Sequence, residues 1–243
     1  MGTTVCDAVN GAEDMTLVAA VDPGHVGEKI HGVEVDKSVE SLAQAKVDAV
    51  VDFTPAAVSF ESLRWCAGKD IHCVVGTTGF SEEQVAHLRS DFGKAKANCV
   101  IAPNFAIGAV LMMHYAAQAA RWFDTAEIIE LHHNRKIDAP SGTAMLTASR
   151  MAAASSHWAP DPTRSEIAAG ARGGNVEGIR VHSVRMRGMV AHQEVVLGTD
   201  GQTLTIRHDS MDRVSFMPGV LLALREVAKR SGLTIGLEPL LGI

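Results

Sequence analysis

The sequence predicts an α/β protein built from a parallel-sheet domain with crossover helices and a second, inserted α+β domain. Over about the first hundred residues, short apolar segments alternate with helical patterns, which is typical of strand–helix–strand units. After about residue 125, turn residues separate several extended segments instead. An apolar helical pattern then returns near the C-terminus. We therefore expect a first domain of residues 1–104 plus 218–243 and a second domain of residues 105–217.

The first domain is predicted to alternate strands with helices. Apolar runs rich in β-branched residues predict strands at 16–21, 47–51, 71–75 and 99–101. Apolar residues at helical spacing predict helices at 3–9, 56–68 and 81–96. The last of these opens with Ser81 three residues before Gln84, which predicts a capping box.

The second domain is predicted to hold a mostly antiparallel sheet. A strand at 127–131 leads through a polar stretch into a helix, and residues 155–178 are rich in Pro, Gly and Ala, which predicts a long loop. Gly188 and the pair Asp200-Gly201 separate three further strands, predicted at 179–186, 191–198 and 202–208.

Composition narrows the class of protein. Lys and Arg number 22 and Asp and Glu 28, so the net charge is 22 − 28 = −6, with no long run of either sign. This balance argues against nucleic acid or an anionic membrane as the partner. The most apolar stretch is interrupted by Pro103, Asn104 and Gly108, so we expect neither a membrane span nor a secretory signal.

The cysteines favour a reducing compartment. Cys6, Cys66, Cys73 and Cys99 stand singly among apolar residues, with no Cys-x-x-Cys spacing. Buried free thiols are therefore the expected state, and we expect a cytoplasmic protein.

Polar or glycine-rich loops follow three of the predicted strands of the first domain. They are Asp22, the segment Gly76-Thr77-Thr78-Gly79, and the segment Ala102-Pro103-Asn104-Phe105. In open α/β sheets ligands bind beyond the carboxyl ends of the strands, and an acid after the second strand of a dinucleotide-binding unit contacts a ribose hydroxyl. These residues are candidates for cofactor binding in a Rossmann-like domain.

Each of these loops also has a purely structural interpretation. Gly76 to Gly79 is equally typical of a tight turn. Asp22 precedes Pro23-Gly24 and is equally typical of a turn residue. Phe105 is expected in the core even if the loop also meets a cofactor.

The start of the chain matches only part of a dinucleotide-binding unit. The helix at 3–9, the strand after it and Asp22 correspond to the second and third parts of that unit, which an apolar strand and a glycine-rich turn normally precede. We therefore expect roughly ten further residues before Met1 in the functional protein.

Residues 130–144, ELHHNRKIDAPSGTA, gather polar groups at the end of a predicted strand. His132 and His133 point to opposite faces if the strand continues, so two roles are more natural than one. Lys136 and the amides of Ser141-Gly142-Thr143 at a helix start are suited to a bound carboxylate. A solvated lysine and a simple helix cap are the alternatives. A metal site of Glu130, His132 and His133 is disfavoured, because no His-x-x-x-His pair supports it.

The same stretch resembles the signature of dihydrodipicolinate reductases. Six further segments fit that family in the same order: Asp52-Phe53-Thr54, Gly76 to Gly79, Ala102 to Phe105, Gly170-Ala171-Arg172-Gly173, Ala191-His192-Gln193-Glu194 and Arg207-His208-Asp209-Ser210. The resemblance covers nearly the whole chain.

The resemblance implies an oxidoreductase of the diaminopimelate route to lysine. Its reaction is the reduction of 4-hydroxy-tetrahydrodipicolinate, a small cyclic dicarboxylate, with NADH or NADPH. Reducing an imine requires a proton donor beside the carbon that receives hydride. By resemblance, the residues matching His132 and Lys136 are catalytic, and those matching His133, Gly142 and Thr143 hold the substrate. The resemblance also implies a homotetramer, with the inserted domain forming the subunit contacts.

Two other functions stay open from the sequence alone. One is a non-catalytic dicarboxylate-binding or regulatory module that does not use a cofactor. The other is a related dehydrogenase acting on another small substrate, against which the stretch at 130–144 counts.

Overall fold

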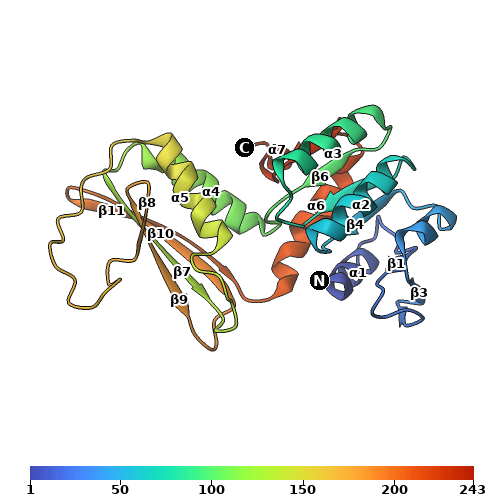
Figure 1. Cartoon of the computed structure of the whole chain (residues 1–243), viewed down its shortest axis with the longest axis horizontal. Coiled ribbons are helices and arrows are strands. Elements are labelled where there is room, and N and C mark those ends of the chain that lie inside the picture. Colours follow the sequence, from blue (N-terminus) through green and yellow to red (C-terminus); the bar gives the residue numbers. More distant parts are fainter. The chain divides into compact units, whose positions relative to one another are not determined.

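The structure, a computed structural model, describes all 243 residues and divides into two compact units (Figure 1). Unit 1 consists of Met1–Ile107 and Arg213–Ile243, and unit 2 consists of Gly108–Asp212. We expected the chain to pass into the second domain after residue 104 and to return to the first after residue 217. Phe105 packs against Phe53, with ring centroids 5.9 Å apart, which explains why the segment after residue 104 still belongs to unit 1.

Unit 1 is built on a parallel sheet of order β12-β6-β5-β4. Its strands are β4 (Ala49–Asp52), β5 (His72–Val75), β6 (Cys99–Ile101) and β12 (Leu233–Ile235). Cys73, Val74 and Val75 have no exposed surface. Burial on both faces is expected of a parallel strand and explains why these segments are continuously apolar rather than alternating.

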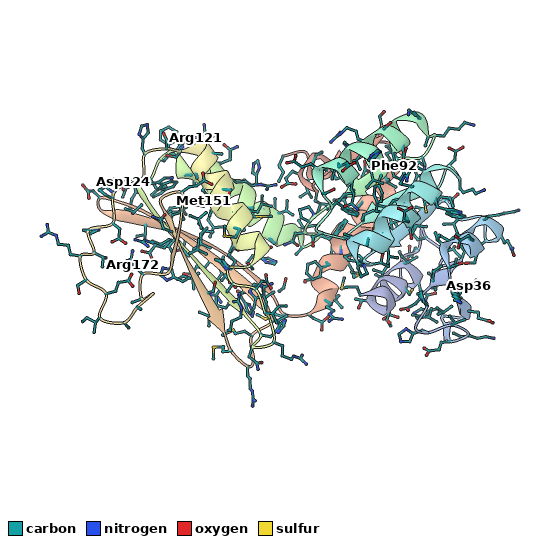
Figure 2. The ribbon with its side chains drawn as sticks, viewed as in Figure 1. Asp36, Phe92, Arg121, Asp124, Met151 and Arg172 are labelled. Carbon is teal, nitrogen blue, oxygen red and sulfur yellow. The ribbon has the colours of Figure 1, made fainter.

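The helices of unit 1 are α1 (Gly2–Asn10), α2 (Ala56–Ala67), α3 (Glu82–Lys94), α6 (Met217–Val227) and α7 (Glu238–Leu241). Helices α2, α3 and α6 pack against this sheet, and α1 and α7 pack against α6. The predicted capping box is confirmed, because Ser81 Oγ accepts the Gln84 N–H at 3.2 Å and Gln84 Oε1 accepts the Ser81 N–H at 2.9 Å. Phe92 of α3 is 1% exposed and lies in the core with Leu63 and Leu88 (Figure 2).

A small second sheet of unit 1 differs from the prediction. It has the order β1-β3-β2, formed by β1 (Ala20–Val21), β2 (Lys29–Ile30) and β3 (Val33–Asp36). The predicted strand at 16–21 was wrong in extent, because only Ala20 and Val21 have ladder partners, on β3. The short strands β2 and β3 and the 3-10 helix η1 (Val39–Gln44) were not predicted. The expectation of further residues before Met1 stays a prediction.

Unit 2 holds a five-stranded sheet of order β11-β10-β7-β9-β8. The strands are β7 (Thr125–His132), β8 (Gly174–Val176), β9 (Ile179–Arg185), β10 (Ala191–Thr199) and β11 (Gln202–Ser210). Only β7 and β9 run parallel, so the mostly antiparallel sheet is confirmed. The loop predicted at 155–178 ends earlier, at residue 173, because residues 174–176 pair with β9 as strand β8.

Two helices cover one face of this sheet, α4 (Ile107–Ala120) and α5 (Gly142–Ala154) (Figure 1). The sequence did not predict α4. Its residues are apolar around nearly the whole circumference, and a helix of that kind has no polar stripe to reveal its period. Met112, Met113 and Ala116 are accordingly buried. Met151 of α5 is also fully buried (Figure 2). None of the helices is long and apolar enough to cross a membrane.

A short linking helix, η2 (Arg213–Phe216), precedes α6, and α6 is pressed against the loop after β6. A Cβ atom at Gly219 would lie 2.1 Å from the Phe105 carbonyl oxygen and 3.2 Å from Leu237 Cδ2. Both neighbours are themselves buried. Glycine at this position therefore allows the helix and the loop to meet backbone to backbone.

Gly219→Ala is expected to lower the free energy of unfolding by about 1–3 kcal/mol, because the added methyl overpacks a rigid contact. Gly93→Ala on α3 is the matched control, since a Cβ there meets nothing within 4 Å. The control is expected to leave stability unchanged or raise it by up to about 1 kcal/mol, following helix propensity. Urea unfolding measures both. Equal stability of the two variants would contradict the close contact.

Candidate active site

The polar stretch at 130–144 begins with the last three residues of strand β7. Alternation along the strand places Glu130 and His132 on the face that α4 and α5 cover. The strand ends at His132, so His133 already belongs to the following turn, in which Lys136 N–H donates to the His133 carbonyl at 3.1 Å. The two rings were predicted to point to opposite faces if the strand continued through His133, and that condition is not met, because β7 ends at His132.

Glu130 is the centre of the cluster. Its side chain has no exposed surface, and each carboxylate oxygen accepts two hydrogen bonds. Oε2 accepts from His132 Nδ1 at 2.5 Å and from Arg185 Nη1 at 2.8 Å. Oε1 accepts from Arg185 Nη2 at 2.7 Å and from the Ser141 N–H at 3.2 Å. One buried carboxylate therefore joins β7, β9 and the start of α5.

Electrostatics keep this carboxylate ionised. Burial alone raises the pKa of a carboxyl group, but the hydrogen bonds from His132 and Arg185 outweigh it and lower the pKa of Glu130 to about 2. Arg185 is opposite His132 in the pairing of β7 with β9, which brings its guanidinium to Glu130 in bidentate geometry.

Lys136 lies in the loop after β7 and is paired with Asp138. Its Nζ donates to both oxygens of Asp138 at 2.8 Å. The hydrogen bond from Lys136 lowers the pKa of the Asp138 carboxyl. The Asp138 carbonyl also accepts from Arg185 Nη2 at 2.7 Å, so the loop that carries Lys136 is attached to the same arginine as Glu130.

The start of α5 completes the cluster. Ser141 Oγ caps the helix by accepting the Ala144 N–H at 3.2 Å, and Gly142 is exposed. A chain of hydrogen bonds fixes Thr143. Its carbonyl accepts a hydrogen bond from Thr147 Oγ1 at 2.7 Å, and Thr147 Oγ1 accepts one from Gln193 Nε2 at 2.8 Å. The structure therefore brings the predicted residues of unit 2, catalytic and substrate-binding, into one neighbourhood.

Sequence reasoning did not give Glu130, Arg185 and Gln193 a place in this site. Glu130 was considered only as a metal ligand, and the structure contains no group of three His, Cys, Asp or Glu side chains arranged to hold a metal ion. The available signal was an acidic residue within an apolar strand, since a buried charge requires partners. Arg185 at the end of another predicted strand was one possible partner.

The other predicted residues lie in unit 1, beyond the carboxyl ends of its strands. The loops there are bonded to one another. The Gly76 N–H donates to the Asp52 carbonyl at 2.8 Å, and Thr77 Oγ1 donates to the Thr54 carbonyl at 2.7 Å. Asp52 Oδ1 accepts the N–H and the hydroxyl of Thr54, each at 2.7 Å. The loops after β4 and β5 therefore form one rigid surface.

Close packing shapes this surface further. A Cβ atom at Gly76 would lie 2.0 Å from the Phe53 ring, so only glycine is compatible with that ring position. Ala102 and Phe105 are buried, whereas Thr78 and Pro103 are exposed. Asn104 Oδ1 accepts the Ala106 N–H at 2.9 Å and fixes the turn. Thr78 and Pro103 are therefore accessible beyond the ends of parallel strands, which is where ligands bind in open α/β sheets.

Asp22 follows β1 in the small sheet and is exposed. Its Oδ1 accepts the Gly24 N–H at 2.8 Å, and its Oδ2 lies 3.1 Å from His25 Nδ1. The Gly24 N–H is the main cause that lowers the pKa of Asp22. The turn predicted at Pro23-Gly24 is present, and it leaves the carboxylate accessible.

Comparison with known proteins identifies relatives over the whole chain. Residues 1–105 match the family model described as dihydrodipicolinate reductase, N-terminus, and residues 108–241 match dihydrodipicolinate reductase, C-terminus. The 4-hydroxy-tetrahydrodipicolinate reductase of Cutibacterium acnes is 54% identical, over 100% of this chain and 95% of the relative. The enzyme of that name from Mycobacterium marinum is 52% identical over the same shares.

Solved structures agree with these matches. A dipicolinate-bound dihydrodipicolinate reductase from a Paenisporosarcina species superposes with a TM-score of 0.89 at 40% identity, covering 98% of this chain and 94% of that one. An amine dehydrogenase from Mycobacterium smegmatis superposes with a TM-score of 0.65 at 14% identity, covering 98% and 92%. The second likeness shows the fold alone.

Arg185→Met is expected to lower the free energy of unfolding at pH 7 by about 3 kcal/mol, because it leaves a buried carboxylate without its cation. The stabilisation due to the depressed pKa of Glu130 is fully present above 4.5 and is lost as the pH falls toward about 2. In the variant, Glu130 is protonated at higher pH, so the difference from the parent is expected to narrow on acidification. Urea unfolding from pH 7 to pH 4 measures this.

Arg225→Met is the control, since Arg225 makes two bonds to Asp14 at 2.7 and 2.9 Å on an exposed surface. Water screens that pair, so its loss is expected to cost much less. Equal losses in the two variants at pH 7 would contradict the account of Glu130.

Proposed function

The chain belongs to the dihydrodipicolinate reductase family, and we propose that the cluster around Glu130 and His132 is its catalytic site. The protein is an NAD(P)H-dependent oxidoreductase that reduces 4-hydroxy-tetrahydrodipicolinate to tetrahydrodipicolinate in diaminopimelate and lysine biosynthesis. The matches span both halves of the chain, which favours this enzyme over a non-catalytic module. The observation that carries the proposed site concerns the buried carboxylate of Glu130. It bonds His132 and the start of α5 directly, and its partner Arg185 bonds the loop that carries Lys136.

His132 is the proposed proton-exchanging group. The bound nicotinamide supplies the hydride, and the protein has to supply a proton close to the carbon that is reduced. The His132 side chain is 16% exposed, so it is largely shielded yet reachable. Its Nδ1 is engaged by Glu130, which leaves Nε2 for the substrate.

Lys136 is the second proposed catalytic group. Its side chain is 21% exposed and carries a positive charge on a loop that Arg185 bonds through the Asp138 carbonyl. It is suited to neutralise a substrate carboxylate and to assist the proton transfer. Asp138 is its partner in the structure, so a bound substrate carboxylate would replace Asp138 as that partner.

The start of α5 is the proposed binding site for a substrate carboxylate. Gly142 and Thr143 open the helix, and backbone N–H groups at a helix start favour an anion. A Cβ at Gly142 would meet nothing within 4 Å, so the space above it is open. With His133, these residues would hold the small cyclic dicarboxylate.

Unit 1 is the proposed cofactor domain, and unit 2 the domain for substrate and subunit contacts. Gly76, Thr77 and Thr78 would contact NADH or NADPH together with Ala102, Pro103, Asn104 and Phe105, and Asp22 would accept hydrogen bonds from ribose hydroxyls. Three buried free cysteines, Cys66, Cys73 and Cys99, support a reducing cytoplasm.

A homotetramer is also part of the proposal. The face of the unit 2 sheet opposite α4 and α5 carries half-buried aliphatic side chains, among them Ile129 and Leu131, beside ion pairs such as Arg207 Nη1–Glu194 Oε2 at 2.8 Å. A large sheet face of this mixed character is suited to contact further copies of the chain.

His132→Gln and Lys136→Ala test the catalytic assignments. His132→Gln is expected to lower kcat about 100-fold with little change in KM, because it removes a general acid. Lys136→Ala is expected to lower kcat/KM by a factor that corresponds to about 3 kcal/mol. Steady-state kinetics measure both, with His87→Gln and Lys229→Ala on exposed surfaces as controls. Either site variant within twofold of the parent would refute its assignment.

Cofactor choice gives a separate prediction. Asp22 offers a carboxylate to ribose hydroxyls, and the following Pro23-Gly24-His25 contains no arginine for a 2′-phosphate. NADH is therefore expected to be used at least as well as NADPH. Side-by-side determination of kcat/KM with the two cofactors measures this, and a strong preference for NADPH would show the interpretation of Asp22 to be wrong.

A further inference from the structure

Glu130 has no assigned part in the reaction, yet His132 is held against it. The two residues are neighbours on the same face of β7, and Nδ1 of the ring lies 2.5 Å from Oε2. An ionised carboxylate only accepts hydrogen bonds, so the ring nitrogen that faces it has to carry a hydrogen. Neutral His132 then has its lone pair on Nε2.

The carboxylate cannot turn away from the ring, because all its bonding directions are occupied. Arg185 takes one direction of each oxygen, and the Ser141 N–H takes the remaining direction of Oε1. With no exposed surface, Glu130 has no water to replace these donors. His132 is therefore oriented by a group that is itself immobile.

We propose that Glu130 is the positioning residue of His132, fixing the ring so that Nε2 is the nitrogen that exchanges a proton with the substrate. The inference rests on the proposed catalytic role of His132. Glu130 does not touch the substrate. Glu130 acts through His132. By accepting the Ser141 N–H, it also fixes the start of α5 relative to the histidine.

The charged groups around His132 agree with this role. Arg185 on β9 and the pair Lys136–Asp138 in the following loop surround Glu130, whereas β10 presents only Ala191 and Gln193 in the same two rows of the sheet. The first turn of α5 carries no acidic residue. Glu130 is therefore the only carboxylate shown in contact with the His132 ring.

Glu130→Gln is the informative variant, because it changes the carboxylate to an amide of the same shape. The new N–H₂ group has to face Arg185 in either orientation. At the Oε1 position it would also face the Ser141 N–H, which cannot accept. At the Oε2 position it faces Nδ1 of His132, which accepts once the ring hydrogen moves to Nε2. This second orientation of the amide is favoured. It leaves a hydrogen on Nε2 of neutral His132, so that nitrogen no longer has a lone pair with which to exchange a proton.

Glu130→Gln is expected to lower kcat about 100-fold, the usual contribution of a positioned acid–base group. The amide oxygen still accepts the Ser141 N–H, so the affinity for pyridine-2,6-dicarboxylate, measured by calorimetry, is expected to stay within about threefold of the parent value. Glu130→Asp keeps a charged acceptor and is expected to recover part of the lost turnover.

Isotope effects separate positioning from a loss of folded protein. If proton transfer becomes the slow step, the solvent deuterium isotope effect on kcat rises. The isotope effect of deuterated NADH on kcat falls, because hydride transfer then limits the rate less. A smaller fraction of active protein lowers kcat and changes neither ratio. Glu127→Gln is the matched control, since Glu127 on the opposite face of β7 also holds a histidine, His182, at 2.7 Å and an arginine, Arg172, at 2.6 Å. It is expected to keep the parental turnover and isotope effects.

The double variant Glu130→Gln, His132→Gln completes the test. A residue that acts only through His132 adds no further loss once His132 is gone, so the double variant is expected to equal His132→Gln. Additive losses, unchanged isotope effects in Glu130→Gln, or equal losses in Glu127→Gln overturn the inference. Full activity of His132→Gln is a different result, because it removes the proposed function on which the inference rests.

Discussion

The buried, ionised carboxylate of Glu130 is the interaction on which the site of unit 2 depends. Moving a carboxylate out of water costs several kcal/mol, and only well-placed donors offset that cost. The donors here come from His132 on the same strand, from Arg185 on β9 and from the cap of α5. Because the charge requires all of them at once, the strand end, the neighbouring strand and the helix start have a single mutual arrangement.

The candidate cofactor surface of unit 1 is fixed by a different means. Its buried carboxylate, Asp52, bonds only within its own loop, to the N–H and the hydroxyl of Thr54. Instead, glycine allows contacts that any side chain would prevent, at Gly76 against the Phe53 ring and at Gly219 against the Phe105 carbonyl. Phe53 and Phe105 then pack against each other. Steric contacts of this kind hold backbone amides in place, whereas the hydrogen-bonded carboxylate of unit 2 holds side chains that change protonation.

Local patterns in the sequence predicted the elements with a clear period, and long-range pairing decided the rest. The parallel strands β4, β5 and β6, the capping box at Ser81 and Gln84, and the start of α5 were predicted because their signals lie within a few residues. The fourth parallel strand, β12, was not predicted. Helix α4 was not predicted, because its apolar residues cover all sides. Arg185 was not linked to Glu130, because only the parallel pairing of β7 with β9 brings the two together. The ion pair of Lys136 with Asp138 likewise requires the geometry of the loop.

The two glutamates of β7 show why burial, rather than residue type, decides which carboxylate can direct chemistry. Glu127 and Glu130 each bind one histidine and one arginine, and in each case these hydrogen bonds outweigh burial and lower the carboxyl pKa. The Glu127 side chain is 36% exposed, so water screens its bonds and offers alternatives to them. Glu130 is fully enclosed and has no such alternatives. On one face of β7, Glu127 therefore belongs to an adaptable surface cluster. On the other face, Glu130 fixes the orientation of the His132 ring.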